Sequence, residues 1–152
     1  MQKTQLLNIS ELISFVSQLP ESASLYDVSD SSFSLVYAND SFYSMVERSR
    51  EDSAIYTGSN ATKSIHPEDL PLIQSFFEHI KKGIYTFDED IRLLKKANSY
   101  IWVHVKIQCI QADNGVKTAF VIFTPVTSKN NSPLISRLDI NKLSKFIEDM
   151  PA

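Results

Sequence analysis

The residues best suited to chemistry in this 152-residue chain are three histidines, one cysteine and a run of carboxylates. His66, His79 and His104 lie far apart, and none has a second ligand at the spacing that metal sites use. Cys109 has no basic neighbour beside it in sequence that would favour a reactive thiolate. Asp88 and Asp90 fall on one face of an expected strand, and we expect that face to be solvated. These residues predict neither a catalytic centre nor a metal site, so we expect no enzyme activity within the chain.

The composition of the chain narrows its partners and its compartment. The net charge is −3 and no basic stretch is present, so we expect no nucleic-acid binding and no contact with a membrane surface. The three glycines form no phosphate-binding loop. A single cysteine fits a reducing compartment, and no stretch of the sequence is apolar enough to span a membrane. We therefore expect a cytoplasmic domain, with any membrane anchor of a parent protein outside this chain.

An amphipathic helix is expected over residues 8–19, because apolar side chains recur there at helical spacing. Its stripe consists of Ile9, Leu12, Val16 and Leu19. Two strands are expected next, over residues 24–28 and 33–38. Asn39 or Asp40 can then cap a short helix. The first helix therefore precedes the sheet that these strands begin.

The longest helix is expected after residues 50–65, which are polar and irregular. Either Pro67 or Pro71 is its first helical residue, and Gly83 supplies its C-terminal cap. Three strands with turn residues between them are expected to follow, over residues 85–95, 100–112 and 116–127. This order predicts an α+β fold, in which helices cover one face of an antiparallel sheet.

The last strand carries apolar side chains on both of its faces. Val121 and Phe123 point one way, whereas Phe120 and Ile122 point the other way. A strand that is apolar on both sides must be covered on both sides. The central helices cover one face, which leaves helix 8–19 or a second subunit to cover the other.

Three stretches of the sequence, taken in order, resemble the PAS family. Residues 35–42 (LVYANDSF) resemble the second strand and first helix of a PAS domain, and residues 65–70 (IHPEDL) resemble the start of its main helix. Residues 87–94 and 100–103 resemble its C-terminal strands, so the resemblance spans residues 21–128. It implies a PAS-like five-stranded antiparallel sheet that cups a small pocket. It also implies a sensory role in a bacterial signal-transduction protein, in cis to an output domain such as a histidine kinase or a diguanylate cyclase.

The resemblance also bears on cofactors. The flavin-binding branch of the family places a reactive cysteine in an Asn-Cys-Arg-Phe motif, but residues 59–63 read Ser-Asn-Ala-Thr-Lys. We therefore expect no flavin–cysteine photochemistry. Some PAS domains hold haem at the main helix, but we expect His79 to be an exposed residue near the helix end and expect no haem. The family often ends its last strand with Asp-x-Thr, and residues 125–127 (Pro-Val-Thr) depart from that pattern.

The end of the chain resembles its beginning. Residues 1–20 carry the first helix, and residues 129–152 read as a linker followed by a second helix. At an offset of 131 residues the matching pairs are Ile9 with Ile140, Leu12 with Leu143, Phe15 with Phe146 and Pro20 with Pro151. We interpret residues 140–152 as the start of a second PAS copy, and an unrelated exit helix is the alternative.

Two functional hypotheses remain open at this point. The first is a sensor that binds a small, mostly apolar ligand, and a cavity of roughly a few hundred cubic ångströms would favour it. Its predicted pocket consists of Phe42, Met45, Ile73, Phe76, Phe77, Ile80, Ile91, Val103, Val105, Val121 and Phe123. The second is a ligand-free module that dimerises or binds other proteins through its flanking helices. The predicted homodimer interface consists of Ile9, Leu12, Val16, Leu19, Phe120 and Ile122.

Overall fold

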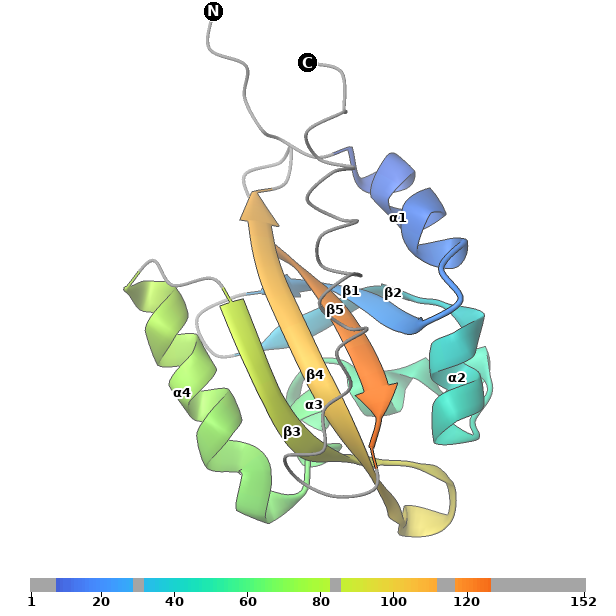
Figure 1. Cartoon of the computed structure of the whole chain (residues 1–152), viewed down its shortest axis with the longest axis vertical. Coiled ribbons are helices and arrows are strands. Elements are labelled where there is room, and N and C mark those ends of the chain that lie inside the picture. The colour runs from blue at the N-terminus through green and yellow to red at the C-terminus, as the bar shows by residue number, and fades with distance from the viewer. Residues whose placement is uncertain (1–7, 29–31, 83–85, 112–116, 127–152) are drawn as a thin grey trace, which may run out of the picture.

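The computed structural model describes residues 8–28, 32–82, 86–111 and 117–126, whose strands form a five-stranded antiparallel sheet (Figure 1). Its elements are α1 (Ile9–Ser17), β1 (Ser22–Val28), β2 (Phe33–Ala38), α2 (Asp40–Val46), η1 (Arg50–Tyr56), α3 (Ser59–Lys63), η2 (Pro67–Asp69), α4 (Leu70–Lys81), β3 (Thr86–Leu94), η3 (Lys96–Asn98), β4 (Tyr100–Gln111) and β5 (Lys117–Pro125). The strand order is β2-β1-β5-β4-β3, and every neighbouring pair is antiparallel. The predicted α+β class and five-stranded sheet are confirmed.

β5 lies in the middle of the sheet, between β1 and β4. Every residue from Thr118 to Phe123 is buried, so both faces of this strand are covered. Val121 and Phe123 belong to the apolar cluster on one face, and Phe120 and Ile122 belong to the cluster on the other. The alternation predicted for the last strand is therefore confirmed.

Helix α1 covers the second face of the sheet, beside β1 and β5 (Figure 1). The Asn8 side chain caps it by accepting a hydrogen bond from the Glu11 amide at 3.2 Å. The apolar spacing brings Leu12 and Val16 onto the sheet, where both are fully buried. We call this set the outer cluster: Leu12, Val16, Ala23, Leu25, Phe120 and Ile122. Of the two coverings expected for this face, the structure shows the helix of the same chain.

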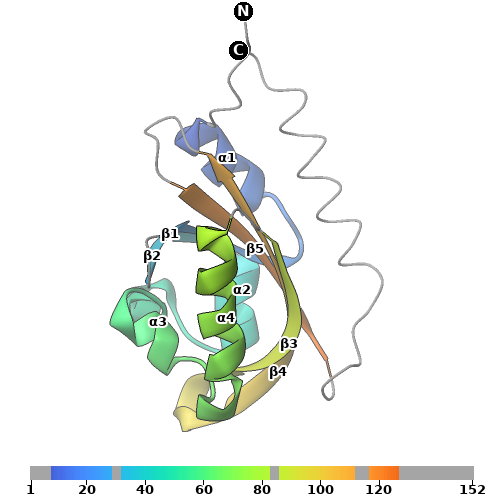
Figure 2. The same ribbon diagram turned by 90° about the vertical axis from the view of Figure 1, so that its left-hand side faces the viewer.

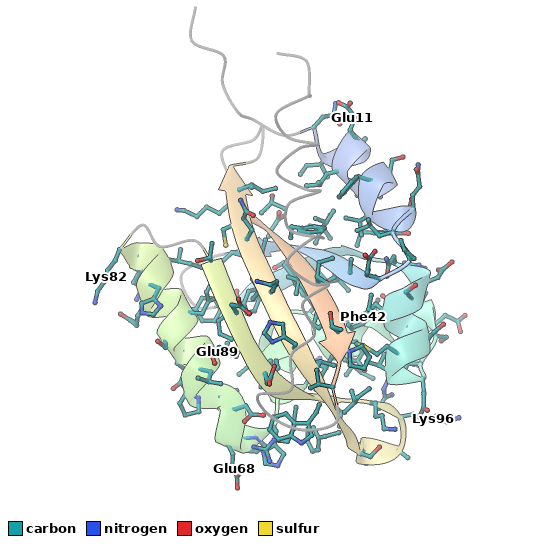
Figure 3. The ribbon with its side chains drawn as sticks, viewed as in Figure 1. Glu11, Phe42, Glu68, Lys82, Glu89 and Lys96 are labelled. Atoms are coloured by element: carbon teal, nitrogen blue, oxygen red, sulfur yellow. The ribbon has the colours of Figure 1, made fainter. Side chains whose placement is uncertain are left out.

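Helices α2, α3 and α4 gather on the first face of the sheet (Figure 2). Both proline candidates are used, because Pro67 opens the short turn η2 and Pro71 lies in the first turn of α4. Glu68 lies at the beginning of the region formed by η2 and α4, and Lys82 lies at its end (Figure 3). The predicted cap, Gly83, lies outside the described residues. The apolar stripe turned toward the sheet consists of Ile73, Phe76, Phe77 and Ile80, all buried as expected.

Residues 50–65 were expected to be irregular, but they contain η1 and α3, and together with His66 they contact both edges of the sheet. On the β2 edge the bonds are Gly58 N–H to Phe33 O (2.6 Å) and Leu35 N–H to Thr57 Oγ1 (2.7 Å). On the β3 edge they are His66 N–H to Arg92 O (3.0 Å) and Leu94 N–H to Ser64 O (2.7 Å). This segment therefore runs under the sheet from one edge strand to the other and gives hydrogen-bond partners to each.

The helix predicted near the end of the chain, over residues 140–152, lies outside the described residues. The proposed repeat at 140–152, the linker before it and the division of the chain at residues 20 and 128 therefore remain predictions. Within the described ranges, no helix is long and apolar enough to cross a membrane.

Candidate functional site

The inner cluster is the set of buried apolar side chains that lie between the sheet and helices α2, α3 and α4. It encloses a cavity of about 50 Å³. The lining residues come from the sheet and from α3 and α4: Tyr26, Phe33, Ala61, Ser64, Ile65, Ile73, Ile91, Leu93, Val105, Ile107, Val121 and Phe123. This cavity lies where the sequence resemblance predicts a pocket.

Five of the predicted pocket residues line the cavity, and the other six do not. The lining five are Ile73, Ile91, Val105, Val121 and Phe123. The remaining six, Phe42, Met45, Phe76, Phe77, Ile80 and Val103, belong to the inner cluster or pack against it. The aromatic members fill the core by contact with neighbouring rings. The ring centroids of Phe76 and Phe87 lie 5.5 Å apart, and those of Phe42 and Tyr56 lie 5.1 Å apart. These six residues therefore form packed core beside the cavity and do not line it.

Sequence reasoning missed seven lining residues: Tyr26, Phe33, Ala61, Ser64, Ile65, Leu93 and Ile107. Tyr26 and Phe33 lie edge to face at 5.4 Å, and Ala61 and Ser64 approach from α3 and the residue after it. Alternation within 24–28 and 33–38 could have assigned the inner face of these strands once the register was known. The α3 residues carry too little periodicity to be placed in this way.

The cavity offers few polar groups to a ligand. The Ser64 hydroxyl donates to the Ala61 carbonyl oxygen at 2.6 Å, so its proton is already in use. Burial raises the pKa of Tyr26, which keeps this phenol neutral at physiological pH. The remaining lining is aliphatic and aromatic, so the site suits a small apolar molecule.

The volume of the cavity limits what it can hold. One water molecule occupies about 30 Å³ in the liquid, and pockets for drug-sized ligands measure roughly 300–1,000 Å³. The observed 50 Å³ is far below that range. In the arrangement described, the core is close to filled, and a larger ligand would require the helices to move away from the sheet.

The residues predicted to form a homodimer interface are already in contact within one chain. Leu12, Val16, Phe120 and Ile122 are fully buried in the outer cluster. Leu19 packs against its margin, and both Leu19 and Ile9 are only partly buried. A dimer through the four buried side chains would require α1 to leave its own sheet. The homodimer itself stays a prediction.

The positions of the three histidines fit structural roles or simple exposure. His66 precedes η2, and its Nδ1 accepts a hydrogen bond from the Glu68 amide at 3.1 Å, which fits a residue that shapes the helix start. His79 is exposed on α4. His104 is buried on the outer side of β4, with Nδ1 2.6 Å from Asp90 Oδ1. Among the described residues, no group of three potential ligands could hold a metal ion.

The expectation that Asp88 and Asp90 share a solvated face is wrong for Asp90. The register of β3 and β4 places Asp90 opposite His104, and only 4% of Asp90 remains exposed. Asp88 is exposed, and it contacts His104 Nε2 and the Lys106 ammonium group. The buried Asp90 carboxylate needs a partner such as His104, because desolvation without one would be costly. Strand pairing, which a single sequence does not reveal, decides the difference.

A second charged contact fixes the beginning of α4 to the edge strand β3. Asp69 accepts hydrogen bonds from the Arg92 backbone at 2.7 Å and from its guanidinium group at 2.9 and 3.0 Å. The guanidinium carbon also lies 4.7 Å from the centre of the Trp102 ring. Burial by itself would raise the pKa of Asp69, but the Arg92 hydrogen bonds and charge outweigh it, so this pKa lies below its ordinary value.

Cys109 lies on the inner face of β4 and is buried, as expected. Burial raises the pKa of its thiol to about 12. The thiolate population at neutral pH is therefore very small, and the residue acts as a small apolar side chain.

A larger hollow of about 740 Å³ lies at the surface between α2 and η1 and is open to solvent. Arg50, one of the cations that line it, already contacts Asp40 at 2.7 Å and donates to the Ala38 carbonyl oxygen at 2.6 Å. The same guanidinium carbon lies 5.0 and 4.9 Å from the ring centres of Tyr37 and Tyr43. Since these contacts hold Arg50 to the protein, we do not place a ligand in this hollow.

Comparison with known proteins agrees with this geometry. A family model described as the PAS fold matches residues 35–124, more than half of the chain. No curated protein matches the chain.

Several solved structures are similar to the chain at low sequence identity. The PAS domain of a two-component sensor histidine kinase is 16% identical, with a TM-score of 0.56 over 78% of this chain and 96% of that one. The PAS domain of a Colwellia psychrerythraea protein is 16% identical, with a TM-score of 0.59 over 78% and 97%. The PAS domain of the fruit-fly ELK potassium channel is 13% identical, with a TM-score of 0.61 over 80% and 99%. At these identities the likeness concerns the fold alone.

Proposed function

The chain belongs to the PAS-fold family, and we propose that it acts as the sensory and regulatory module of a signalling protein whose output domain lies outside this chain. In this role, a change in the packing of the inner cluster alters the docking of α1 on the outer cluster. Helix α1 then passes the change to the rest of the protein. A histidine kinase or a diguanylate cyclase is the output that the sequence resemblance implies.

The observation that carries the proposal is the position of β5 between the two clusters. Consecutive residues of this strand face opposite clusters: Val121 and Phe123 the inner one, Phe120 and Ile122 the outer one. A displacement of the strand by the inner cluster therefore also displaces the seat of α1. Because packed cores rearrange between discrete arrangements, such a displacement can act as a switch.

The small volume of the cavity favours relay through protein contacts over a large resident ligand. The core holds about 50 Å³ of free space, far less than the roughly 300–1,000 Å³ of a pocket for a drug-sized ligand. A second candidate function is the sensing of a small apolar molecule, and the apolar lining of the cavity favours it. Native mass spectrometry of the purified chain, with extraction of small molecules, would show whether a ligand accompanies it.

Xenon can test both steps of the proposal, since it is an apolar probe that enters dry protein cavities. We expect the ¹H–¹⁵N spectrum under xenon pressure to shift at Ile91 and Val121, which line the cavity, and also at Leu12 and Val16 in α1. In the Val121→Ile variant, which fills part of the cavity, both sets of shifts should decrease together.

Two outcomes of the xenon experiment would contradict parts of the proposal. Shifts confined to the lining residues would contradict the relay to α1. The absence of any shift at the lining residues, in a protein that folds normally, would contradict the sensing of small apolar molecules at this cavity.

The homodimer is a separate proposal about how the module is used. Ile9 and Leu19 are the members of the predicted interface that are not fully buried, so a dimer could form at the margin of α1 without removing it from the sheet. We expect sedimentation at micromolar concentration to report a dimer, and Ile9→Glu to shift it toward the monomer because a carboxylate would be desolvated. A monomer at high micromolar concentration would contradict this proposal.

A further inference from the structure

One buried amide connects the two clusters through hydrogen bonds. Asn39 lies between β2 and α2, and only 1% of it is exposed. It is the N-cap of α2, as one of the two sequence candidates predicts. Its side chain also contacts β1, the end of α1 and the connection between them. These contacts are hydrogen bonds to Ala23, Val16 and Glu21, in addition to the cap bond to Phe42.

The oxygen of the Asn39 amide holds α2 and β1. Its Oδ1 accepts from the Phe42 backbone amide at 3.0 Å and from the Ala23 backbone amide at 3.1 Å. Both partners are donors, so they fix which end of the amide is the oxygen. This half of the side chain alone would make an ordinary N-cap.

The nitrogen of the Asn39 amide holds α1. Its Nδ2 donates to the carbonyl oxygens of Glu21 at 2.8 Å, Val16 at 3.1 Å and Leu19 at 3.4 Å. The last carbonyl groups of a helix and those just beyond it lack the usual helical partner four residues on, so other donors satisfy them. The Val16 carbonyl oxygen also accepts from the Leu19 backbone amide at 3.2 Å. Asn39 supplies such donors from the far side of the sheet's first hairpin.

Asn39 also adjoins the aromatic wall of the inner cluster. Phe42, whose amide it caps, is fully buried and points from α2 toward β5 (Figure 3). The Phe42 ring lies 5.1 Å from the rings of Tyr56 and Phe123. A shift of α2 in the core therefore displaces Asn39 Oδ1, and the same rigid amide carries Nδ2 away from the carbonyl groups of α1.

We propose that Asn39 is a positioning residue that couples the docking of α1 on the outer cluster to the packing of α2 in the inner cluster. This proposal identifies a residue for the relay proposed above. It rests on that function only for the biological use of the coupling. The coupling itself is a property of the fold, and the test needs neither a ligand nor a partner. Its failure is therefore distinguishable from failure of the sensory role.

Asn39→Asp separates the two halves of the side chain. Aspartate caps a helix as well as asparagine does, so the bonds to Phe42 and Ala23 remain, but it has no N–H to donate to α1. We expect hydrogen exchange across the α1 amides to become at least roughly 10-fold faster, because one or two net hydrogen bonds are lost. The second carboxylate oxygen also faces the carbonyl oxygens that Nδ2 held, which adds to the loss, so Asn39→Ser is measured beside it as the uncharged variant. Exchange across 103–109 and 118–123 should remain unchanged.

Ser41→Ala is the matched control. The Ser41 hydroxyl donates to the Pro20 carbonyl oxygen at 2.9 Å, so it joins α2 to the same connection without contacting α1. We expect α1 exchange in this variant to change by less than about threefold, since the lost bond is exposed. An equal acceleration in both variants would overturn the role of Asn39.

Coupling, as distinct from simple stabilisation, is tested with a second substitution. Phe42→Leu loosens α2 in the core, and we expect it to accelerate α1 exchange in the parent chain but to add nothing in the Asn39→Asp background. Unchanged α1 exchange in Asn39→Asp, or an undiminished effect of Phe42→Leu in that background, would overturn the proposal. If Asn39→Asp does not fold, Asn39→Ser, which keeps a cap oxygen and lacks the amide nitrogen, is measured with the same two outcomes.

Discussion

The inner and outer clusters share one sheet but are built differently. The outer cluster consists of six fully buried side chains, brought together by one nine-residue helix and the two strands beneath it. The inner cluster draws on five strands and several helical segments, is rich in aromatic rings and encloses free space. A small cluster sealed by one short helix can open locally, whereas a large one can rearrange without opening. In the proposed relay, α1 on the outer cluster is therefore the part that moves, and the inner cluster is the part that responds.

The largest expected effect is on the inner cluster. Phe76 is 1% exposed and contacts the rings of Phe33, Phe77 and Phe87. We expect Phe76→Ala to lower the free energy of unfolding by roughly 3–5 kcal/mol, measured by equilibrium urea unfolding. His79→Ala on the exposed side of the same helix should change it by less than about 0.5 kcal/mol. A near-zero effect of Phe76→Ala would mean that this core relaxes around the loss and is less packed than described.

The second effect concerns the outer cluster and should remain local. Leu12→Ala should cost roughly 2–3 kcal/mol in the stability of α1 docking, because it removes a fully buried side chain. Hydrogen exchange should accelerate across α1, with little change across 103–109, since the helix can detach before the sheet unfolds. Equal acceleration in both regions would show that the two clusters unfold as one unit, and the comparison between them would fail.

The third expected effect is a loss of stability at low pH, caused by Asp69 at the beginning of α4. A carboxyl group with a lowered folded-state pKa stabilises the fold above its unfolded-state pKa, and this stability is lost as the pH falls through the folded-state pKa. Asp69 is such a group, so the free energy of unfolding should fall as the pH drops below about 4. Asp69→Asn should cost about 2 kcal/mol at neutral pH, and it should flatten this acid dependence.

A matched control for the pH experiment lies next to Asp69. Glu68 also contacts Arg92, at 3.2 Å, but its side chain is 75% exposed. Glu68→Gln should therefore change stability by less than about 0.5 kcal/mol. An acid dependence that survives Asp69→Asn would show that the contact between Asp69 and Arg92 does not hold the edge of the inner cluster.

The smallest expected effect tests whether the inner cluster has free space that the outer cluster lacks. Val121→Ile adds one methylene group beside the cavity and should raise the free energy of unfolding by about 0.5–1 kcal/mol. Val16→Ile adds the same group to the fully buried outer cluster and should lower it by about 1 kcal/mol, because that cluster is already packed. Thermal unfolding of both variants measures the difference. The same sign in both would mean that the clusters do not differ in packing.

Local patterns in the sequence predicted the main elements of the fold because those patterns are strong. The spacing of Leu12 and Val16 predicted a helix with one buried face, and the double apolar alternation around Val121 predicted that a second layer was needed. The patterns did not decide whether that layer came from the same chain. That choice depends on the path of the connection after α1 and on the carbonyl groups that Asn39 holds there.

The candidate site was only half predictable, for a physical reason. Helix α4 carries a clear periodic stripe, so its buried face could be assigned, but of that face only Ile73 lines the cavity. Ala61 lies on a five-residue helix, which is too short to show periodicity. The pairing of Asp90 with His104 depends on strand register, which joins residues by distance in space and leaves no local pattern.

The path of residues 50–66 has a consequence for behaviour at high concentration. Exposed sheet edges promote association between molecules, because their unpaired backbone groups accept a further strand. Here the same short segment occupies part of β2 through Thr57 and Gly58 and part of β3 through Ser64 and His66. Among the described residues, no backbone group pairs with the outer side of β3 between Thr86 and Asp90, where three consecutive acidic residues lie. Asp88 and Asp90 there are paired with Lys106 and His104, which leaves the exposed Glu89 carboxylate to repel the same end of a second copy. We therefore expect association at this edge to be limited by hydrogen bonds at Phe33, Leu35, Arg92 and Leu94 and by the charge of Glu89 beyond them.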